Sequence, residues 1–474
     1  MRKSFFIVQE SIKHFPIPLR KSPAYRQAGL KLSLKRDFLR SSRSDFLVIL
    51  AFAFCLLPLA GCSSKQAESG ATITVWHWMT DREPAFQDLA KRYEAKTGIK
   101  INFELYAPSD AYSQKVRAAA QGISLPDIFG ILGEKRDFAS FIKAGHILDL
   151  TPYVESSGGE WKNRFFAKAL AVNEFSEGNS YAVKAGIYGV PIDIMTIQMV
   201  YNKDLFKALG LNPEQPPSTF QEFLDIGKKI KQANMQGLVS GWGEAWMIGC
   251  LANNYAFNIM GEEKVLKTIK GEVAYADPDW IKVLSLFKEM RDSGVLASGL
   301  VTMVNKNAEQ LFANDKAVFA FNGSWCVNVY KSMNPNLKYA AMLPPKASDK
   351  YPVSIWGGAG SSFMVNGRSK NKEEAVKFLK WFTDRDQQAY LAETTSNPPA
   401  NKDALSMISP ILAQFADDIE RATHPNAWGI SESPQVLETF NKGIQSIIIG
   451  EKSPEQVARE TQKIKDKEMA KNTR

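Results

Sequence analysis

The sequence predicts an α/β protein whose mixed sheets are flanked by helices. Strand-like and helix-like patterns alternate along the chain from residue 72, and the alternation begins a second time after residue 190. The 474 residues are enough for two lobes that each bury their own core. With 45% hydrophobic and 23% charged residues, the composition is that of an ordinary globular protein.

The first alternating region predicts a βαβαβ unit. Apolar residues recur at helical spacing after Pro84, where Asp81 is expected to cap the helix, and strands read as short apolar or alternating runs. The expected order is strand 72–78, helix 84–97, strand 99–105, helix 109–121 and strand 127–131. This order implies a largely parallel sheet with crossover helices. Asp127 is expected to fix the turn at the third strand, and His77 to be packed or capped.

The second region repeats these signals. Residues 196–201 predict a strand, and Ser218 to Glu222 contain two overlapping capping boxes that open a helix. Asp277-Pro278 opens another helix, which Gly294 closes and in which Trp280 and Phe287 are expected to be core residues. Late helices are predicted at 372–382 and 453–469.

The basic character of the chain is concentrated at its start. The formal net charge is +9, but residues 1–61 hold 11 of the 59 basic and 3 of the 50 acidic residues. The rest is therefore nearly neutral and has no basic surplus to attract a phosphate backbone. We exclude nucleic acid as a partner and interpret the basic stretch as an export signal.

The start of the chain predicts a lipoprotein signal. Residues 46–60 (FLVILAFAFCLLPLA) have the length of a secretory apolar region and are too short for a spanning helix. They end in LAGC (59–62), which resembles the lipobox of bacterial lipoproteins. Cys62 is then the lipidation site, residues 1–61 the signal peptide and residues 62–71 a flexible tether. The alternative is a short membrane anchor or a buried helix that ends in cysteine.

Two cysteines of the mature chain remain after Cys62. Cys250 and Cys326 both lie in apolar or aromatic stretches. They are expected to pack as free, small hydrophobic residues. The alternative is a disulfide, which an exported protein could form.

Several stretches, in this order, resemble the family 1 extracellular solute-binding proteins, which include the maltose-binding protein. The stretches are ITVWHWMTD (73–81), LPDIFG (125–130), GHILDLTPYV (145–154), YGVPIDI (188–194), VYNKDLFKALGL (200–211), PPSTFQEF (216–223), FNGSW (321–325) and WGGAG (356–360). The tail FNKGIQSIIIGEKSPEQVARETQ is similar to the closing helices of the family.

The resemblance implies a two-lobed periplasmic-binding-protein-like fold of type II, with a hinged cleft between the lobes. It implies an N-terminal lobe of residues 72–192 plus 345–392 and a C-terminal lobe of residues 193–343 plus 393–474. It also implies a monomeric, exported lipoprotein, anchored to the bacterial membrane by Cys62, that captures a carbohydrate. The protein would deliver this ligand to the permease subunits of an ABC importer, and no cofactor or metal is expected.

Aromatic residues are the first candidates for ligand contact. The apolar C–H faces of a pyranose stack on flat rings, and tryptophan offers the largest face together with an N–H donor. The tryptophans that fall where the family places cleft residues are Trp78, Trp242, Trp246, Trp325 and Trp356. The alternative for each is a packing role in a core or between the lobes.

Polar candidates complete the predicted site. Carboxylates and amides that could meet sugar hydroxyls are Asp81, Glu134, Asp193 and Asn322. Glu134 falls where the maltose-binding protein has a cleft carboxylate, although Ile131 replaces a tryptophan of that protein. Gly357 and Gly358 either expose backbone N–H groups to a hydroxyl or allow a tight crossing between the lobes.

Two other functions remain open on the sequence alone: a surface-anchored carbohydrate-active hydrolase, and a ligand sensor without transport. A glycosidase needs two carboxylates at a set separation, which the composition cannot test. The chain contains no HExxH, GxSxG, GxxxxGK[ST], CxxC or GxGxxG motif, which favours a binding protein over an enzyme. Among the candidate cleft stretches only Arg82 could pair with the carboxylate of an amino-acid ligand.

Overall fold

The computed structural model, which describes residues 72–472, begins with the predicted βαβαβ unit. Strand β1 (Thr72–His77) pairs in parallel with β2 (Lys100–Leu105) and with β3 (Ile128–Phe129). Helices α1 (Glu83–Thr97) and α2 (Ser109–Gln121) form the crossovers between them. Parallel neighbouring strands need such crossover connections. The predicted βαβαβ unit is therefore confirmed.

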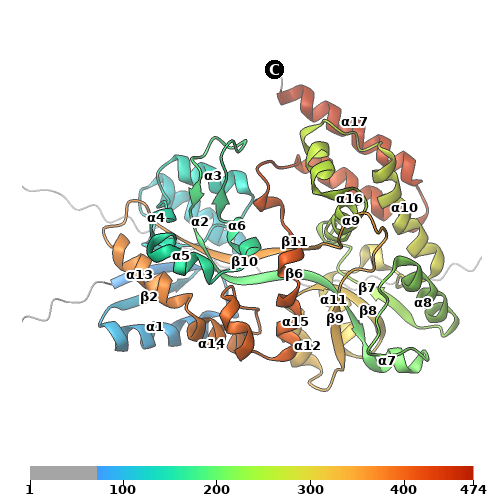
Figure 1. The fold of residues 1–474 in the computed structure, drawn as a ribbon, viewed down its shortest axis with the longest axis horizontal. Helices are drawn as coiled ribbons and strands as arrows, with labels where there is room; N and C mark the ends of the chain where they lie inside the picture. Colours follow the sequence, from blue (N-terminus) through green and yellow to red (C-terminus); the bar gives the residue numbers. More distant parts are fainter. Residues whose placement is uncertain (1–71, 473–474) are drawn as a thin grey trace, which may run out of the picture. The chain divides into compact units, whose positions relative to one another are not determined.

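The other elements follow in chain order (Figure 1). The helices are α3 (Lys135–Lys143), α4 (Thr151–Val154), α5 (Ser156–Asn163), α6 (Ala167–Ala171), α7 (Lys203–Ala208), α8 (Phe220–Gln232), α9 (Trp246–Lys270), α10 (Pro278–Ser293), α11 (Asn305–Ala313), α12 (Cys326–Met333), α13 (Lys372–Phe382), α14 (Arg385–Thr395), α15 (Pro410–Asp417), α16 (Pro434–Ile449) and α17 (Pro454–Asn472). The strands are β4 (Glu174–Phe175), β5 (Gly186–Ile187), β6 (Val190–Asn202), β7 (Gln236–Val239), β8 (Ala317–Gly323), β9 (Tyr339–Met342), β10 (Ile355–Val365) and β11 (Ala422–Thr423). Short 3-10 helices are η1 (Leu300–Thr302), η2 (Lys402–Met407), η3 (Ile419–Arg421) and η4 (Pro425–Ala427).

Two long strands, β6 and β10, join the two lobes. The sheet order is β2-β1-β3-β10-β6-β8-β7, with β11 beside β10 and β9 beside β6. The first half of β6 pairs antiparallel with β10, and its second half pairs with β8 and β9. The predicted lobe boundary at residues 192/193 therefore lies inside a continuous strand. In Figure 1 both strands run between the two groups of helices.

Side-chain alternation along these strands places cores on both faces of the sheet. In β3, Ile128 belongs to one cluster of buried side chains and Phe129 to another. In β6, Met199 and Val200 are divided in the same way between two further clusters. Strands that are buried on both faces have apolar residues at successive positions, which explains the unbroken apolar runs of the sequence. The fold is the predicted two-lobed α/β fold.

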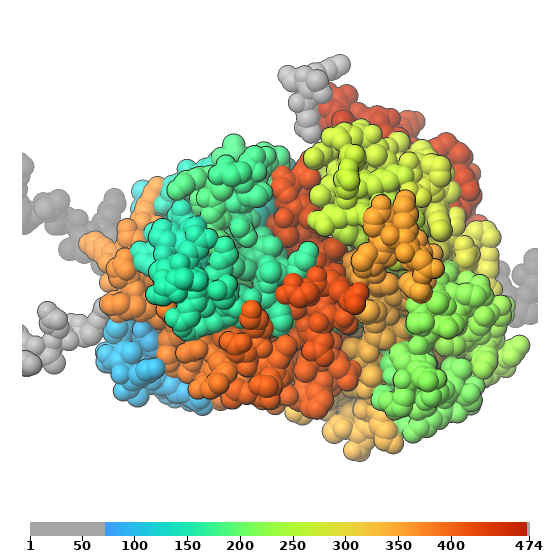
Figure 2. All heavy atoms as spheres, in the orientation of Figure 1, coloured from blue at the N-terminus to red at the C-terminus, as the bar shows by residue number. Residues whose placement is uncertain are grey.

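The two principal clusters show how the chain returns between the lobes. One of them draws its buried residues from 73–194 and from 355–422, and the other from 197–342 and 428–458. The resemblance places residues beyond 393 in the second lobe, and the structure divides them: Ala400 and Ile419 pack in the first cluster, whereas Phe415 of α15 packs with residues of the second lobe. Residues 424–432, which we call the strap, connect the two clusters. Figure 2 shows the orange-red C-terminal segments between the blue-green and the yellow-green parts of the surface.

Most local predictions agree with the structure. Thr219 and Glu222 form the capping box of α8, Asp277 caps α10, and both Trp280 and Phe287 are core residues. The Asp127 carboxylate accepts hydrogen bonds from the Thr74 backbone N–H and the Ser369 hydroxyl, which fixes the start of β3 as predicted.

Among the other local predictions, the N-cap of α1 needs correction, whereas His77 and the two cysteines are as expected. Arg82, and not Asp81, is the N-cap residue of α1, because the helix begins at Glu83. His77 is buried and pairs with Glu83 at 2.7 Å, as expected for a packed histidine. Cys250 and Cys326 are both free and buried.

The predicted signal peptide, Cys62 and the tether lie outside the described residues. In the part that the structure describes, we find no helix with the length and apolar character that crossing a membrane requires.

Candidate ligand-binding site

A cavity of about 480 Å³ lies between the lobes and takes its walls from both of them. Its first-lobe wall comes from the residue after β1, from the loop after β3 and from β10. Its second-lobe wall comes from α9 and α16, and the strap closes one side. Its volume lies in the range of sites that hold a sugar-sized or drug-sized ligand.

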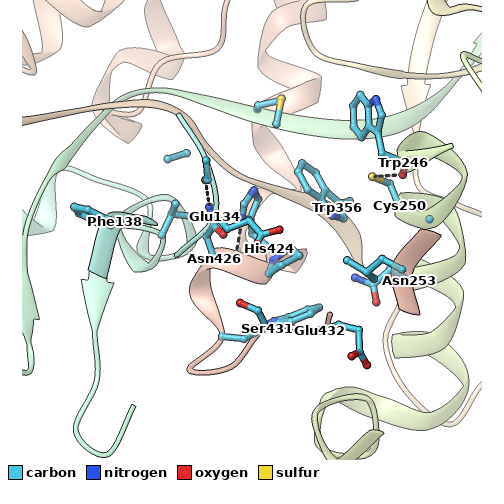
Figure 3. A pocket seen from close by; sticks show the side chains of 18 of the residues that line it. Glu134, Phe138, Trp246, Cys250, Asn253, Trp356, His424, Asn426, Ser431 and Glu432 are labelled. Atoms are coloured by element: carbon cyan, nitrogen blue, oxygen red, sulfur yellow. Dashed lines mark hydrogen bonds between the residues drawn. The ribbon is translucent and has the colours of Figure 1, made fainter. Parts of the chain in front are cut away.

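Three aromatic side chains from different sides of the cavity form a row along it. Trp246 begins α9, Trp356 lies in β10 and His424 follows β11. The ring centroids of Trp246 and Trp356 are 6.4 Å apart, and those of Trp356 and His424 are 4.5 Å apart. Figure 3 shows the three rings following one another along the cavity. Trp246 is 44% exposed, so a broad indole surface is open to a ligand.

His424 is the polar end of this aromatic row. Its Nδ1 accepts a hydrogen bond from the backbone N–H of Asn426 at 3.0 Å, which fixes the ring. Burial lowers the pKa of His424 from 6.5 to about 4, and the nearby positive charge of Lys135 acts in the same direction. A neutral imidazole can be stacked on a sugar without the cost of desolvating a charge.

We expect the His424 imidazole to stay neutral as the pH falls through 6.5 and to titrate only near pH 4. The unfolded chain binds this proton at about pH 6.5, so the stability contributed by neutral His424 is full above that pH. It is lost as the pH falls from 6.5 towards 4. NMR of the histidine ring protons over this range measures the pKa directly.

The His424→Asn variant assigns the resonance, since asparagine keeps an acceptor for the backbone N–H of Asn426. A titration midpoint of His424 at its ordinary value of about 6.5 would contradict the burial argument.

Trp78 is held rigidly on the first lobe. Its ring packs over Gly130, where a Cβ would lie 2.5 Å from a ring carbon, and beside Tyr112 at a centroid distance of 5.1 Å. The Tyr112 hydroxyl donates to the carbonyl oxygen of Gly130 at 2.8 Å and fixes this loop. An aromatic face set in this way is pre-organised for stacking.

Glu134 and two free amides supply polar groups. Glu134 lines the cavity as predicted and pairs with Arg136 at 3.1 Å. Asn253 of α9 and Asn441 of α16 also line it, and neither amide bonds to another residue in the described range 72–472. Free amides can donate to and accept from hydroxyl groups.

Asp193 does not reach the cavity, which corrects its prediction as a ligand contact. It is buried in β6 and forms an ion pair with Arg82 at 2.5 Å. Burial raises the pKa of Asp193 to about 6, despite the opposing effect of Arg82. Arg82 in turn donates to the hydroxyl of Ser361, which lines the cavity. Asp193 therefore positions the wall and holds the only arginine that the sequence offered for an anionic ligand.

Trp242 is also misplaced by the prediction, because its ring is fully buried in the core of the second lobe. Gly241 and Gly243 bring the backbone against Asn305 and Thr302, at distances that a Cβ would not permit. This close packing turns Trp242 inward, and Trp246 points to the cavity four residues later.

Trp325 and Asn322 do not line the cavity either. The Trp325 ring covers Gly323 and packs against the second-lobe core. Asn322 is buried in β8, where its amide donates to Glu309 and its carbonyl accepts from Gly323. Its hydrogen-bonding groups serve the fold.

The remaining candidates have structural roles. Asp81 is half exposed beside Arg82 and is absent from the walls of the cavity. Gly357 and Gly358 pair with Thr196 and Met195 in the ladder between β10 and β6. The tight crossing, and not exposure of N–H groups, is the interpretation that the structure supports.

The sequence analysis missed the strap. Its residues His424, Pro425, Asn426, Trp428, Ser431 and Glu432 all line the cavity. The Asn426 side chain accepts from the Lys135 backbone N–H on the first lobe, and Tyr181 bonds to Ser431. On the second lobe, Trp428 stacks on Phe257. The mixture of aromatic and amide residues in HPNAWG (424–429) is typical of a ligand-binding loop. It has no helical or strand periodicity, so a search for regular elements does not find it.

No metal centre is apparent within residues 72–472, where no three His, Cys, Asp or Glu side chains gather in a suitable arrangement.

The chain matches the bacterial extracellular solute-binding protein family over residues 88–423, and it belongs to this family. It is 26% identical over 417 residues to a Brucella abortus protein whose name specifies binding but no ligand, covering 85% of this chain and 95% of that protein. It is 23% identical to the multiple sugar-binding protein of Streptococcus mutans, covering 73% and 79% of the two chains.

Solved structures confirm the fold. The apo-form of RafE from Streptococcus pneumoniae superimposes with a TM-score of 0.68 at 17% identity, covering 83% of this chain and 97% of that one. The family is one of solute-binding proteins, and the Streptococcus mutans relative is named as a sugar-binding protein.

Proposed function

We propose that this protein is the solute-capturing component of a bacterial ABC importer and that its ligand is a carbohydrate. The observation that carries the proposal is the row of Trp246, Trp356 and His424 in an interlobe cavity, with Trp78 of the first lobe also in its lining. The similarity to a multiple sugar-binding protein supports it.

The chemistry of the cavity suits hydroxyl-rich ligands. Flat indole faces meet the C–H faces of a pyranose, while Asn253 and Asn441 are free to meet hydroxyl groups at its edge. No lysine or arginine belongs to the described lining, so the cavity offers no cationic partner for a phosphate or carboxylate.

Ligand capture would follow from closure of the lobes about β6 and β10. The two principal cores suggest lobes of about 72–192 plus 355–422 and about 197–343 plus 428–472, with α15 (410–417) packed on the second lobe. The last crossing of the chain between the lobes would then be the strap. A ligand that contacts both walls favours the closed state, because only that state makes all the contacts.

We further propose that the chain is exported, is lipidated on Cys62 and acts as a monomer, as the lipobox and the family resemblance imply. The tether would then keep the cavity near the membrane permease that receives the ligand.

Titration of the purified mature chain with a panel of neutral oligosaccharides and glycosides tests this function. We expect saturable changes in tryptophan fluorescence. The melting temperature should rise with ligand concentration, because binding adds RT ln(1 + [L]/Kd) to the free energy of unfolding. Chromatography should recover the sugar intact. Release of shortened sugars would favour a hydrolase, and no response across the panel would exclude the carbohydrate proposal.

A further inference from the structure

The cavity continues past the aromatic row into the second lobe, between α9 and α16. This extension, which we call the arm, is lined by Val265, Ile269, Tyr275, Trp280, Leu437 and Phe440. Val265 and Ile269 lie one turn apart on α9. The rings of Tyr275, Trp280 and Phe440 contact one another at centroid distances of 5.0 to 5.6 Å. The arm is thus a continuous apolar and aromatic surface.

The polar atoms at the arm are already bonded within the protein. The Trp280 indole N–H donates to the Thr268 hydroxyl at 2.9 Å. The Tyr275 hydroxyl donates to Glu432 at 3.1 Å. Neither group is therefore available to replace the water that a polar ligand group would lose on entering.

Glu432, the carboxylate at the arm, is saturated in the same way. Its Oε1 accepts from Lys465 Nζ and from the Ser433 backbone N–H, at 2.9 and 2.7 Å. Its Oε2 accepts from Lys465 Nζ and the Tyr275 hydroxyl. A carboxylate has about four acceptor positions, and here four bonds occupy them. Lys465 also neutralises its charge, so Glu432 attracts neither a hydroxyl nor a cation.

The part of the cavity lined by Trp246, Trp356, Asn253 and Asn441 differs from the arm. Asn253 and Asn441 are without partners in the described chain, and the indole N–H groups of Trp246 and Trp356 make no hydrogen bond to residues 72–472. Figure 3 shows Asn253 and Glu432 on the side of the cavity away from Glu134. The cavity therefore has groups that can recognise hydroxyl groups, and an arm whose own polar atoms are already bonded and which can only exclude water.

We propose that the arm is a subsite for an uncharged apolar group, such as an aryl aglycone, carried by a hydroxyl-rich ligand. This inference rests on the proposed function for the hydroxyl-rich part alone. The ligand class is then a glycoside with an apolar substituent, whose sugar lies on the aromatic row and whose substituent enters the arm.

Matched pairs of ligands test the subsite. Calorimetric titration should compare methyl and phenyl β-glycosides of glucose, galactose and xylose. For any sugar that binds, we expect the phenyl glycoside to bind at least about tenfold more tightly, because it alone removes a large apolar surface from water. Equal affinities within each pair would overturn the proposal.

Variants locate the preference in the arm. Val265→Phe fills it, and Leu437→Lys places a charge at a side chain that is 43% exposed, so the second variant does not disturb a core. Both should abolish the phenyl preference and leave the methyl glycoside affinity within about twofold. Ile449→Lys is the matched control, since Ile449 is an exposed residue of the same helix outside the cavity. A phenyl preference that persists in Leu437→Lys contradicts the assignment.

Phenol alone separates the two proposals. Methyl resonances of Val265 and Ile269 should shift on titration with phenol in the unmodified protein, and those of Ile269 should not shift in Val265→Phe. Absence of any shift overturns the arm as a binding subsite. If phenol shifts these resonances but no carbohydrate binds at all, the apolar subsite stands and the proposed carbohydrate function fails.

Discussion

Trp356→Ala is expected to weaken binding of the best carbohydrate in the panel by about 30- to 100-fold, equivalent to about 2–3 kcal/mol. Trp356 is the middle ring of the row, so its loss removes the stacking face and the contact that orients both Trp246 and His424. Its half-buried position at the cavity means that the fold should survive the change. Fluorescence or calorimetric titration measures the affinity, and circular dichroism checks the fold.

Trp381→Ala provides the matched control for this experiment. Trp381 is also a half-buried indole, but it lies on α13 against Tyr93 and Phe378 and does not line the cavity. Its removal should leave affinity unchanged. An unaltered affinity in Trp356→Ala, or an equal loss in both variants, would remove the aromatic row from the binding site.

Lys465→Met is expected to lower the free energy of unfolding by about 3–5 kcal/mol, the usual cost of leaving one partner of a buried ion pair alone. Lys465 and Glu432 are 6% and 5% exposed, and the ammonium group also donates to the Ile269 carbonyl oxygen. The lost charge leaves Glu432 buried at the end of the strap. Urea denaturation followed by circular dichroism should show the lower midpoint.

Two further variants show whether the loss of stability in Lys465→Met comes from the unpaired charge of Glu432. The double variant Lys465→Met/Glu432→Gln should regain most of the stability, because no buried charge is left without a partner. Lys471→Met removes an exposed lysine that pairs with Glu468 on the same helix, and it should change stability by less than about 0.5 kcal/mol. A single variant as stable as the unmodified protein would show that the pair does not secure the strap.

The fold was predictable wherever local patterns decide the structure. Caps such as Thr219 with Glu222, and the alternation from 72 to 131, encode their elements within a few residues. The crossing strand β6 was only half predicted, as residues 196–201. Its first half contains Pro191, which cannot donate to a ladder and lies opposite the register shift between Ser361 and Ser362 of β10. Only the tertiary structure makes that strand continuous.

The sequence indicated which residue types line the cavity, but it did not indicate which side chains face the cavity and which face the core. Tryptophan was the expected stacking residue, and Trp78, Trp246 and Trp356 line the cavity. Trp242 differs from Trp246 only in where its neighbours pack, which no local pattern records. The strap and its His424 lack periodicity and were invisible for that reason, and the arm arises from helices that are distant in the sequence.

The chain crosses between the lobes at β6, at β10 and at the strap, and α15 of the 355–422 segment also packs on β6 and β9. Two adjacent strands that share a hydrogen-bonded ladder can twist and bend together, but they resist sliding past each other. The strap lies apart from β6 and β10. It therefore prevents the lobes from rotating about the long axis of these two strands. Such an arrangement leaves one easy rotation, about a single axis, so every opening and closing should retrace one path and present the cargo in one orientation.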